Sequence, residues 1–296
     1  MSRVVILRPA AKVNLTLRVG ARRADGFHEV RTLLQSIGLF DRLTFTPRKG
    51  PFALTTASFG VPVDSTNLVW RAADRLWREL GHEGPARDAH VRLDKKIPVA
   101  AGLGGGSADA AAALVGLNVI WGRRASKGVL ARLAAELGSD VPFFLQGGTA
   151  LGTGRGDELY PVDDIRRYGV IVIKPSFGVA TADAYRWLDE DRVGNVDGSP
   201  RDGCGIDLGW PRDPVSLVND LEAPVARRHP EITTMIEACL AAGAKAAAMT
   251  GSGSAVFGLF PEALVARAGR RLQRPDWHVL VARTLGRREA GRLGGL

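Results

Sequence analysis

The sequence predicts an α+β fold divided into two domains. Strand-like and helix-like patterns are mixed along the chain without a strict strand–helix–strand alternation, which favours α+β packing. The 296 residues are enough for two domains, and 45% of them are hydrophobic, so sizeable cores can be buried. We place the boundary near residue 160, which gives an N-terminal domain over 1–160 and a C-terminal domain over 161–296.

The N-terminal half begins with strands. A short β-branched run covers 4–7, and apolar and polar residues alternate from 12 to 19. Alternation with a period of two is typical of a half-buried strand and places Lys12 and Asn14 on one face. Asp25-Gly26 marks a turn. Further strands are expected over 29–37, 41–46 and 89–93, and helices over 67–80, 107–121, 126–137 and from 139 to a glycine pair at 147–148.

The C-terminal half mixes both element types. Strands are expected over 169–174, 246–250, 255–260 and 278–284, and helices over 180–188, 214–228, 232–242 and 262–272. The segment 194–214 is rich in Gly, Pro and Asp, which predicts a mobile loop. We expect the arginine-rich tail over 283–292 to be disordered.

Composition and charge exclude several classes of protein. The net charge is +9, but the basic residues are scattered as isolated pairs and not as a long block interleaved with aromatics. We therefore expect no nucleic-acid partner, and interpret the charge as solvated surface that attracts anionic substrates. Cys204 and Cys239 offer neither a disulfide framework nor a metal-ligand spacing. No run of eighteen apolar residues exists and the start of the chain turns polar early, so we expect a cytoplasmic protein without membrane contact.

The strongest functional signal is a glycine-rich segment that runs directly into an alanine-rich helix. Glycines let the backbone approach a ligand closely, and a helix N-terminus presents free N–H groups and a positive dipole end. Together they predict a phosphate cradle. The segment lacks the lysine of a Walker loop and the spacing of a dinucleotide fingerprint. A plain turn would not need three consecutive glycines. The predicted cradle comprises Pro98, Val99, Ala100, Ala101, Gly102, Leu103, Gly104, Gly105, Gly106, Ser107 and Ala108.

This loop resembles the phosphate loop of the GHMP kinases, which reads Pro-x-x-x-Gly-Leu-Gly-(Gly)-Ser-Ser/Ala. The triple glycine followed by Ser-x-Asp-Ala-Ala is most similar to the branch that acts on a cytidine diphosphate-linked methylerythritol. The resemblance implies a ribosomal S5-like N-terminal domain and a ferredoxin-like C-terminal domain, with the active site between them. It also implies ATP and Mg²⁺ as cofactors. Ser107 has two open roles: it caps the helix, or it offers its hydroxyl to phosphate or Mg²⁺.

Two catalytic residues follow from the resemblance. Lys12 lies in Ala-Lys-Val-Asn-Leu, similar to the family's Ala-Lys-Val/Leu-Asn-Leu, and is expected to orient the acceptor hydroxyl and stabilise charge on the γ-phosphate. Asp140 lies in Gly-Ser-Asp-Val-Pro, similar to the family's Gly-Ser/Ala-Asp-Val/Ile-Pro, and is the expected base or orienting group. Taken alone, Lys12 would be a surface lysine and Asp140 a helix cap.

The resemblance also implies binding residues. The segment 22–29 is similar to the branch's Arg-x-Asp-Gly-Tyr/Phe-His, so Phe27 would stack on cytosine and His28 would hydrogen-bond its edge. The phenylalanine keeps the stacking and removes a phenol hydrogen bond. The segment 249–255 is similar to the family's third motif, whose glycine turn would close over the site. The other predicted contacts are Asn14 with the acceptor, Thr181, Asn219 and Asp220 near the substrate, and Asn67 and Lys96 beside adenine. We assign no metal ligands.

The reaction that the resemblance implies is ATP-dependent phosphorylation of the 2-hydroxyl of 4-diphosphocytidyl-2-C-methyl-D-erythritol, in the non-mevalonate (methylerythritol phosphate) route to isoprenoid precursors. One alternative is another GHMP small-molecule kinase, of the homoserine or mevalonate type; the cytidine-pocket signature argues against it. The other is a catalytically silent RNA-binding homologue, against which Lys12 and Asp140 argue. We expect a monomer or weak homodimer.

Overall fold

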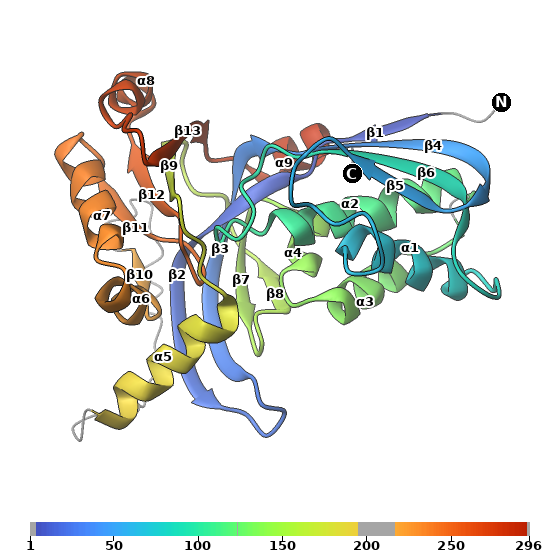
Figure 1. The fold of residues 1–296 in the computed structure, drawn as a ribbon, viewed down its shortest axis with the longest axis horizontal. Helices are drawn as coiled ribbons and strands as arrows, with labels where there is room; N and C mark the ends of the chain where they lie inside the picture. The colour runs from blue at the N-terminus through green and yellow to red at the C-terminus, as the bar shows by residue number, and fades with distance from the viewer. Residues whose placement is uncertain (1–3, 123, 195–216, 295–296) are drawn as a thin grey trace.

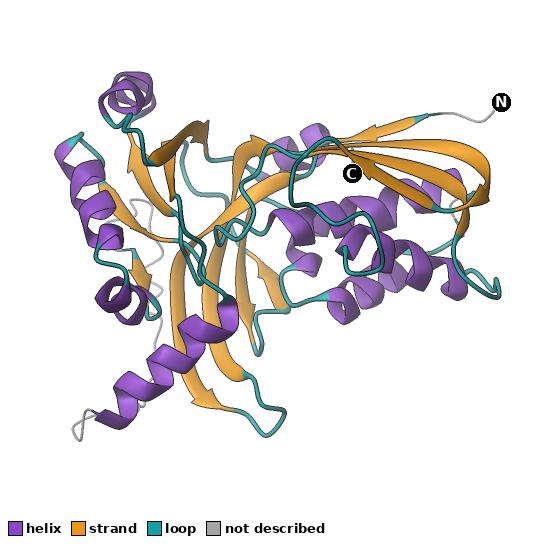
Figure 2. Cartoon of the chain, in the orientation of Figure 1, coloured by secondary structure: helices purple, strands orange, loops and turns teal. Residues whose placement is uncertain are grey.

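The computed structural model describes residues 4–122, 124–194 and 217–294. The predicted α+β fold is confirmed: helices and three separate sheets are mixed along the described chain, as Figures 1 and 2 show. In the first sheet the strand order is β1-β4-β6-β5. Its strands are β1 (Val5–Leu7), β4 (Arg42–Pro51), β5 (Ala53–Thr56) and β6 (Arg87–Asp94).

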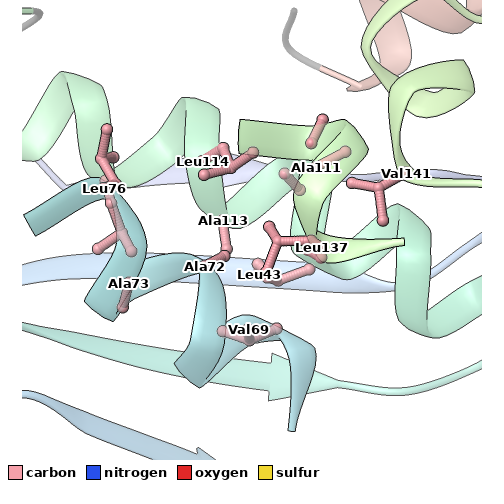
Figure 3. Close-up of a cluster of buried hydrophobic side chains, with 14 of the residues drawn as sticks. Leu43, Val69, Ala72, Ala73, Leu76, Ala111, Ala113, Leu114, Leu137 and Val141 are labelled. Atoms are coloured by element: carbon pink, nitrogen blue, oxygen red, sulfur yellow. The ribbon is translucent and has the colours of Figure 1, made fainter. Parts of the chain in front are cut away.

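Four helices cover one face of this sheet (Figure 1). They are α1 (Leu68–Glu79), α2 (Gly105–Ile120), α3 (Lys127–Leu137) and α4 (Val141–Gln146). Helix α2 is buried on nearly all sides, since it packs against α1, α3, α4 and β4. Its alanines and Gly116 let these neighbours approach closely: a Cβ at Gly116 would lie 2.5 Å from the Phe45 ring. Figure 3 shows part of this core, to which Leu76, Leu114 and Leu137 belong.

The second sheet runs through the middle of the molecule, with strand order β10-β2-β3-β7-β8. Its long strands β2 and β3 form an antiparallel hairpin whose pairing is interrupted by a bulge between Asn14 and Thr16. The short β10 pairs in parallel with β2, so the C-terminal half contributes a strand to the sheet of the N-terminal half. The strands are β2 (Ala10–Arg22), β3 (His28–Phe40), β7 (Thr149–Thr153), β8 (Glu158–Pro161) and β10 (Val218–Asn219).

The third sheet is antiparallel throughout, with strand order β11-β12-β9-β13. Helix α7 packs on β11 and β12, and α8 packs on β9 and β13. The strands are β9 (Gly169–Pro175), β11 (Ala246–Met249), β12 (Val256–Phe260) and β13 (Trp277–Arg283), and the helices of this half are α5 (Thr181–Gly194), α6 (Glu222–Arg228), α7 (Glu231–Ala241) and α8 (Glu262–Arg271).

The buried clusters divide mostly between the two halves of the chain, but they do not locate a domain boundary. One buried cluster lies wholly within residues 7–150, and another consists mostly of residues after 170. A third joins them, because Val13 and Leu15 of β2 pack with Val172 and Phe257 of the third sheet. The boundary near 160 stays a prediction. Among the described residues, no helix combines the length and apolar character needed to cross a bilayer.

Three expectations about local structure need correction or lie outside the described residues. The helix predicted over 214–228 begins only at Glu222, because residues 218–219 pair with β2. The arginine-rich tail is ordered up to residue 294: it contains the end of β13 and α9 (Arg287–Gly294). The Arg287 guanidinium donates to the carbonyls of Thr149 and Val162, at 2.9 and 3.0 Å, which anchors this helix. The predicted loop over 194–214 lies almost entirely outside the described residues.

Candidate active site

A cleft of about 1050 Å³ is lined by residues from both halves of the chain. The N-terminal half supplies the glycine-rich loop, β2, the β2–β3 turn and the start of α4. The C-terminal half supplies α5 and the turn at Gly251-Ser252-Gly253. All the residues from Pro98 to Ser107 line it, whereas the predicted contact Ala108 is buried outside the lining.

The loop is shaped by backbone conformations that favour glycine. Gly102 and Gly104 have φ of 73° and 70°, and Gly104 is the N-cap of α2. No side chain caps this helix end, whose first residues line the cleft, so its N-terminal N–H groups are left without a capping acceptor. The helix-cap interpretation of Ser107 is therefore wrong: the serine lies within the first turn of α2 and lines the cleft. An N-terminus of this kind binds anions.

The two predicted catalytic groups meet in the cleft. The Lys12 Nζ lies 3.6 Å from the Asp140 Oδ2, although 128 positions separate them in the sequence. The Lys12 side chain is only 4% exposed, whereas that of Asp140 is 41% exposed. Lys12 also donates to Asn14 Oδ1 at 2.7 Å, and the Asn14 amide donates to Thr32 Oγ1 at 2.7 Å. The ammonium is thus held by its neighbours, while the carboxylate remains open to a ligand.

Asp140 stands at the N-cap position of α4, but its side chain makes no capping hydrogen bond. The helix begins with Pro142 in its first turn, whose ring sets a helical φ without a side-chain cap. The alternative interpretation of Asp140 as a helix cap therefore receives no support from the geometry. Its carboxylate faces the cleft beside Ser139 and Lys12.

The predicted cytosine contacts lie at another part of the cleft. Phe27 is 53% exposed at the β2–β3 turn, and the Arg155 guanidinium carbon lies 5.3 Å from its ring centroid. His28 is buried, with Nε2 2.8 Å from Asp189 Oδ1, and its ring stacks on Tyr185 at a centroid distance of 5.2 Å. Tyr185 and Asp189 both come from α5. Burial and the nearby Asp140 carboxylate raise the pKa of Tyr185 to about 12, so its hydroxyl stays protonated at neutral pH.

The third glycine motif lies against the loop, as expected. Thr250 accepts the backbone N–H of Asn14 at 3.1 Å, and a Cβ at Gly102 would lie 2.0 Å from the Thr250 carbonyl oxygen. Thr181 lines the cleft, and its hydroxyl is 3.1 Å from that of Ser252.

Two predicted substrate contacts do not line the cleft. The Asn219 amide donates to the carbonyls of Met249 and Gly251, both at 2.8 Å, so it holds the glycine turn in place. Asp220 accepts from Arg18 and from the Val19 backbone N–H. Asn219 belongs to β10 and Asp220 follows it, and their hydrogen bonds join this strand to its neighbours.

Of the two residues predicted beside adenine, one lines the cleft and the other does not. Asn67 lines the cleft; it caps α1 through the Val69 N–H. Lys96 is exposed and lies outside the lining, whereas its neighbour Lys95, whose side chain is only 8% exposed, lines it.

Several lining residues were not predicted. Tyr185 and Asp189 of α5, Arg155 of the β7–β8 turn, and Lys95 and Asp109 beneath the loop all belong to this site. The one available signal was Asp109, a carboxylate inside a run of alanines, since a charged residue in a buried helix requires a partner. Within the described ranges, no group of three or more His, Cys, Asp or Glu side chains is arranged to hold a metal ion.

Comparisons with known proteins agree with this geometry. The profile of the GHMP kinase N-terminal domain matches residues 67–148, and that of the GHMP kinase C-terminal domain matches 206–275. The 4-diphosphocytidyl-2-C-methyl-D-erythritol kinase of Moorella thermoacetica is 43% identical, over 95% of this chain and 99% of its own length. The protein of the same name from Pelotomaculum thermopropionicum is also 43% identical, over 95% of this chain and 98% of its own.

A crystal structure of 4-(cytidine 5'-diphospho)-2C-methyl-D-erythritol kinase superposes with a TM-score of 0.79 and 32% identity, over 95% of this chain and all of that one. Homoserine kinase from Cytophaga hutchinsonii shares the fold, with a TM-score of 0.72 at 20% identity. The chain therefore belongs to the GHMP kinases and, within them, to the family of 4-diphosphocytidyl-2-C-methyl-D-erythritol kinases.

Proposed function

We infer that the chain transfers the γ-phosphoryl group of ATP to the 2-hydroxyl of 4-diphosphocytidyl-2-C-methyl-D-erythritol. The observation that carries this conclusion is the meeting of three parts in one cleft: a glycine-rich anion cradle, the Lys12–Asp140 pair, and the aromatic pocket of Phe27 and His28. GHMP kinases use ATP as the donor. The full-length similarity to relatives named for this substrate selects the acceptor.

Phosphoryl transfer depends mainly on positioning and on stabilisation of charge. The N–H groups around Gly104 would hold the triphosphate with its terminal group toward Lys12. Asp140 would accept the proton of the acceptor hydroxyl while its oxygen forms the new bond to the γ-phosphorus, and the bond to the β-phosphate oxygen breaks to release ADP. Lys12 Nζ, fixed by Asn14 Oδ1, would stabilise the negative charge on the transferring group.

The protein would provide few metal ligands of its own. Mg²⁺ prefers oxygen ligands and is usually held by one or two protein oxygens together with substrate phosphates and water. The Ser107 hydroxyl lines the cleft beside the cradle and fits such a role. Mg²⁺ bound there would neutralise part of the charge on the phosphates, and the protein would supply the shaped loop around them.

The test is a kinase assay with ATP and each candidate acceptor. We expect ADP and a singly phosphorylated product with the cytidylylated alcohol, and no product with homoserine or mevalonate. Phe27→Ala should raise KM for the cytidylylated alcohol roughly 5- to 150-fold, because base–aromatic stacking contributes about 1–3 kcal/mol. Phe59→Ala removes a fully exposed aromatic ring and is the matched control. Phosphorylation of only an acceptor without cytidine would refute the assignment.

A further inference from the structure

Three charged side chains lie buried beneath the phosphate loop and have no part in the chemistry proposed above. The Lys95 ammonium lies 2.5 Å from Asp41 Oδ2 and 2.8 Å from Asp109 Oδ2. The side chains of Lys95, Asp41 and Asp109 are 8%, 0% and 3% exposed. Lys95 and Asp109 both belong to the lining of the cleft.

These contacts tie the two ends of the loop together. Asp41 lies at the junction of β3 and β4, and its Oδ1 accepts the backbone N–H groups of Lys96 and Ile97 at 2.6 and 2.9 Å, where the chain enters the loop. Asp109 belongs to α2, where the chain leaves the loop. Lys95 connects both carboxylates, so one ammonium bridges the entry and the exit of the segment that would hold the triphosphate.

The bridge lies against the loop backbone itself. A Cβ on Gly105 would lie 3.0 Å from the Lys95 Nζ and 2.9 Å from Ile97 Cγ2. The ammonium and Ile97 therefore lie so close to Gly105 that they leave no room for a side chain there, and a shift of the ammonium would disturb the packing at the end of the loop. Interiors packed at this density transmit such shifts.

The Asp109 side chain is held by its hydrogen bond with Lys95. Asp109 Oδ1 is buried without a hydrogen-bond partner among the described residues, whereas Oδ2 accepts from Lys95. Burial raises the pKa of Asp109 well above its usual range, against the opposing influence of Lys95. The two carboxylates keep the pKa of Lys95 above its ordinary value despite its burial, so the ammonium is charged at neutral pH.

We propose that Lys95 and Asp109 are positioning residues of the nucleotide site, whose hydrogen bond fixes the spacing between the two ends of the phosphate loop and thereby sets the affinity for the nucleotide's phosphates. The proposal rests on the proposed function, since it takes the loop as the nucleotide cradle. It requires an acceptor oxygen at position 109 and not a full negative charge. Asn at this position keeps the shape and that acceptor, whereas Ala removes both.

The experiment compares Asp109→Asn and Asp109→Ala by the Kd of a fluorescent ADP analogue, measured without any acceptor alcohol. Asp109→Ala should weaken ADP binding at least tenfold, and Asp109→Asn should stay within threefold of the wild type. In the kinase assay, Asp109→Ala should raise KM for ATP by a similar factor while KM for the alcohol stays within twofold.

A second comparison separates positioning from simple loss of stability. Leu133→Ala removes a buried side chain of α3, which does not line the cleft, and should lower Tm without changing the ADP Kd. Should Asp109→Ala fail to fold, Asp109→Ser, whose shorter side chain does not reach Lys95, replaces it with the same expected loss of affinity.

Two results would overturn the proposal. One is an ADP Kd of Asp109→Ala that equals the wild-type value, measured at a temperature where the variant is folded. That unchanged Kd is the behaviour expected of the Leu133→Ala control. The other is an equal loss of affinity in Asp109→Asn and Asp109→Ala, which would assign the effect to the carboxylate charge. If the wild-type protein binds ADP but does not phosphorylate the cytidylylated alcohol, the proposed function is refuted. The comparison of the Asp109 variants would still test the positioning role of Lys95 and Asp109.

Discussion

Replacing Asp140 with Asn tests the proposed chemistry most directly. The substitution keeps the size of the side chain but removes the proton acceptor 3.6 Å from Lys12. General-base catalysis contributes about 10²- to 10⁴-fold to rate, which corresponds to about 3–5.5 kcal/mol of activation free energy. We therefore expect kcat to fall by two to four orders of magnitude.

The same structure predicts what Asp140→Asn leaves unchanged. The side chain makes no capping bond to α4 and is 41% exposed, so losing its ion pair should change the free energy of unfolding by about 1 kcal/mol or less. Removing a negative charge near the expected γ-phosphate position should leave nucleotide affinity equal or slightly tighter. Steady-state kinetics, binding of a non-hydrolysable ATP analogue and thermal melting measure the three quantities.

Asp163→Asn makes the same charge change at an exposed carboxylate outside the cleft lining and is the control, with wild-type kcat expected. A parallel loss of kcat and nucleotide affinity in Asp140→Asn would refute the reasoning, because it would show that Asp140 supports the loop and not the chemistry. A wild-type kcat would refute it as well.

Two further predictions concern the loop and the buried thiol. Gly102→Ala should abolish nucleotide binding or folding, because its Cβ would lie 2.0 Å from the Thr250 carbonyl oxygen at a φ of 73°. Gly128→Ala in α3 lies outside the cleft lining, and its Cβ would meet no atom closer than 3.9 Å, so this control should bind ADP normally. Equal behaviour of the two variants in an ADP titration would contradict the close approach seen here. Burial raises the pKa of the Cys239 thiol to about 12. In a Cys204→Ser variant, where Cys239 is the remaining cysteine, we therefore expect no reaction with a thiol reagent at pH 8 until the protein is unfolded. Rapid reaction of the folded variant, followed by absorbance, would show that the thiol is accessible.

The loop and the Lys12 strand were predictable because their signals are local. Glycines with positive φ and a helix start are consecutive in the sequence, and alternation with a period of two places Lys12 and Asn14 on one face whatever the tertiary fold. The alternation could not show that this face is buried. Lys12 is almost fully covered because two glycine turns lie against it: a Cβ at Gly251 would lie 3.3 Å from its Nζ, and one at Gly104 would lie 3.1 Å from its Cγ.

Sequence alone could not decide which of two neighbouring lysines lines the cleft. Lys95 and Lys96 follow β6 directly, and neighbouring side chains in extended chain point in opposite directions. Which of them faces the loop depends on how β6 pairs with β4 and on where Asp41 lies at the preceding strand junction. The resemblance pointed to Lys96, whereas Lys95 is the lysine that forms ion pairs with the buried carboxylates.

The expected cytosine pocket depends even more on tertiary contacts. Phe27 and His28 belong to a recognisable segment, but Tyr185 and Asp189 lie on a helix whose pattern carries no chemical signal. They reach His28 because α5 lies across the β2–β3 hairpin, where Arg192 donates to the Val19 and Gly20 carbonyls. Helical periodicity predicts which residues share a face but not which distant hairpin that face covers.

The position of the Lys12 ammonium depends on both halves of the chain. Asn14 Oδ1 accepts from Lys12 Nζ at 2.7 Å, and the same oxygen lies 3.3 Å from the Thr250 hydroxyl, which in turn accepts the Asn14 backbone N–H. Asn219 holds the backbone on either side of Thr250, through the Met249 and Gly251 carbonyls. Asn219 lies outside the cleft but still bears on the chemistry, because it fixes the segment that fixes Asn14. The C-terminal half therefore does more than close the cleft: it sets the orientation of the ammonium that the proposed transfer requires.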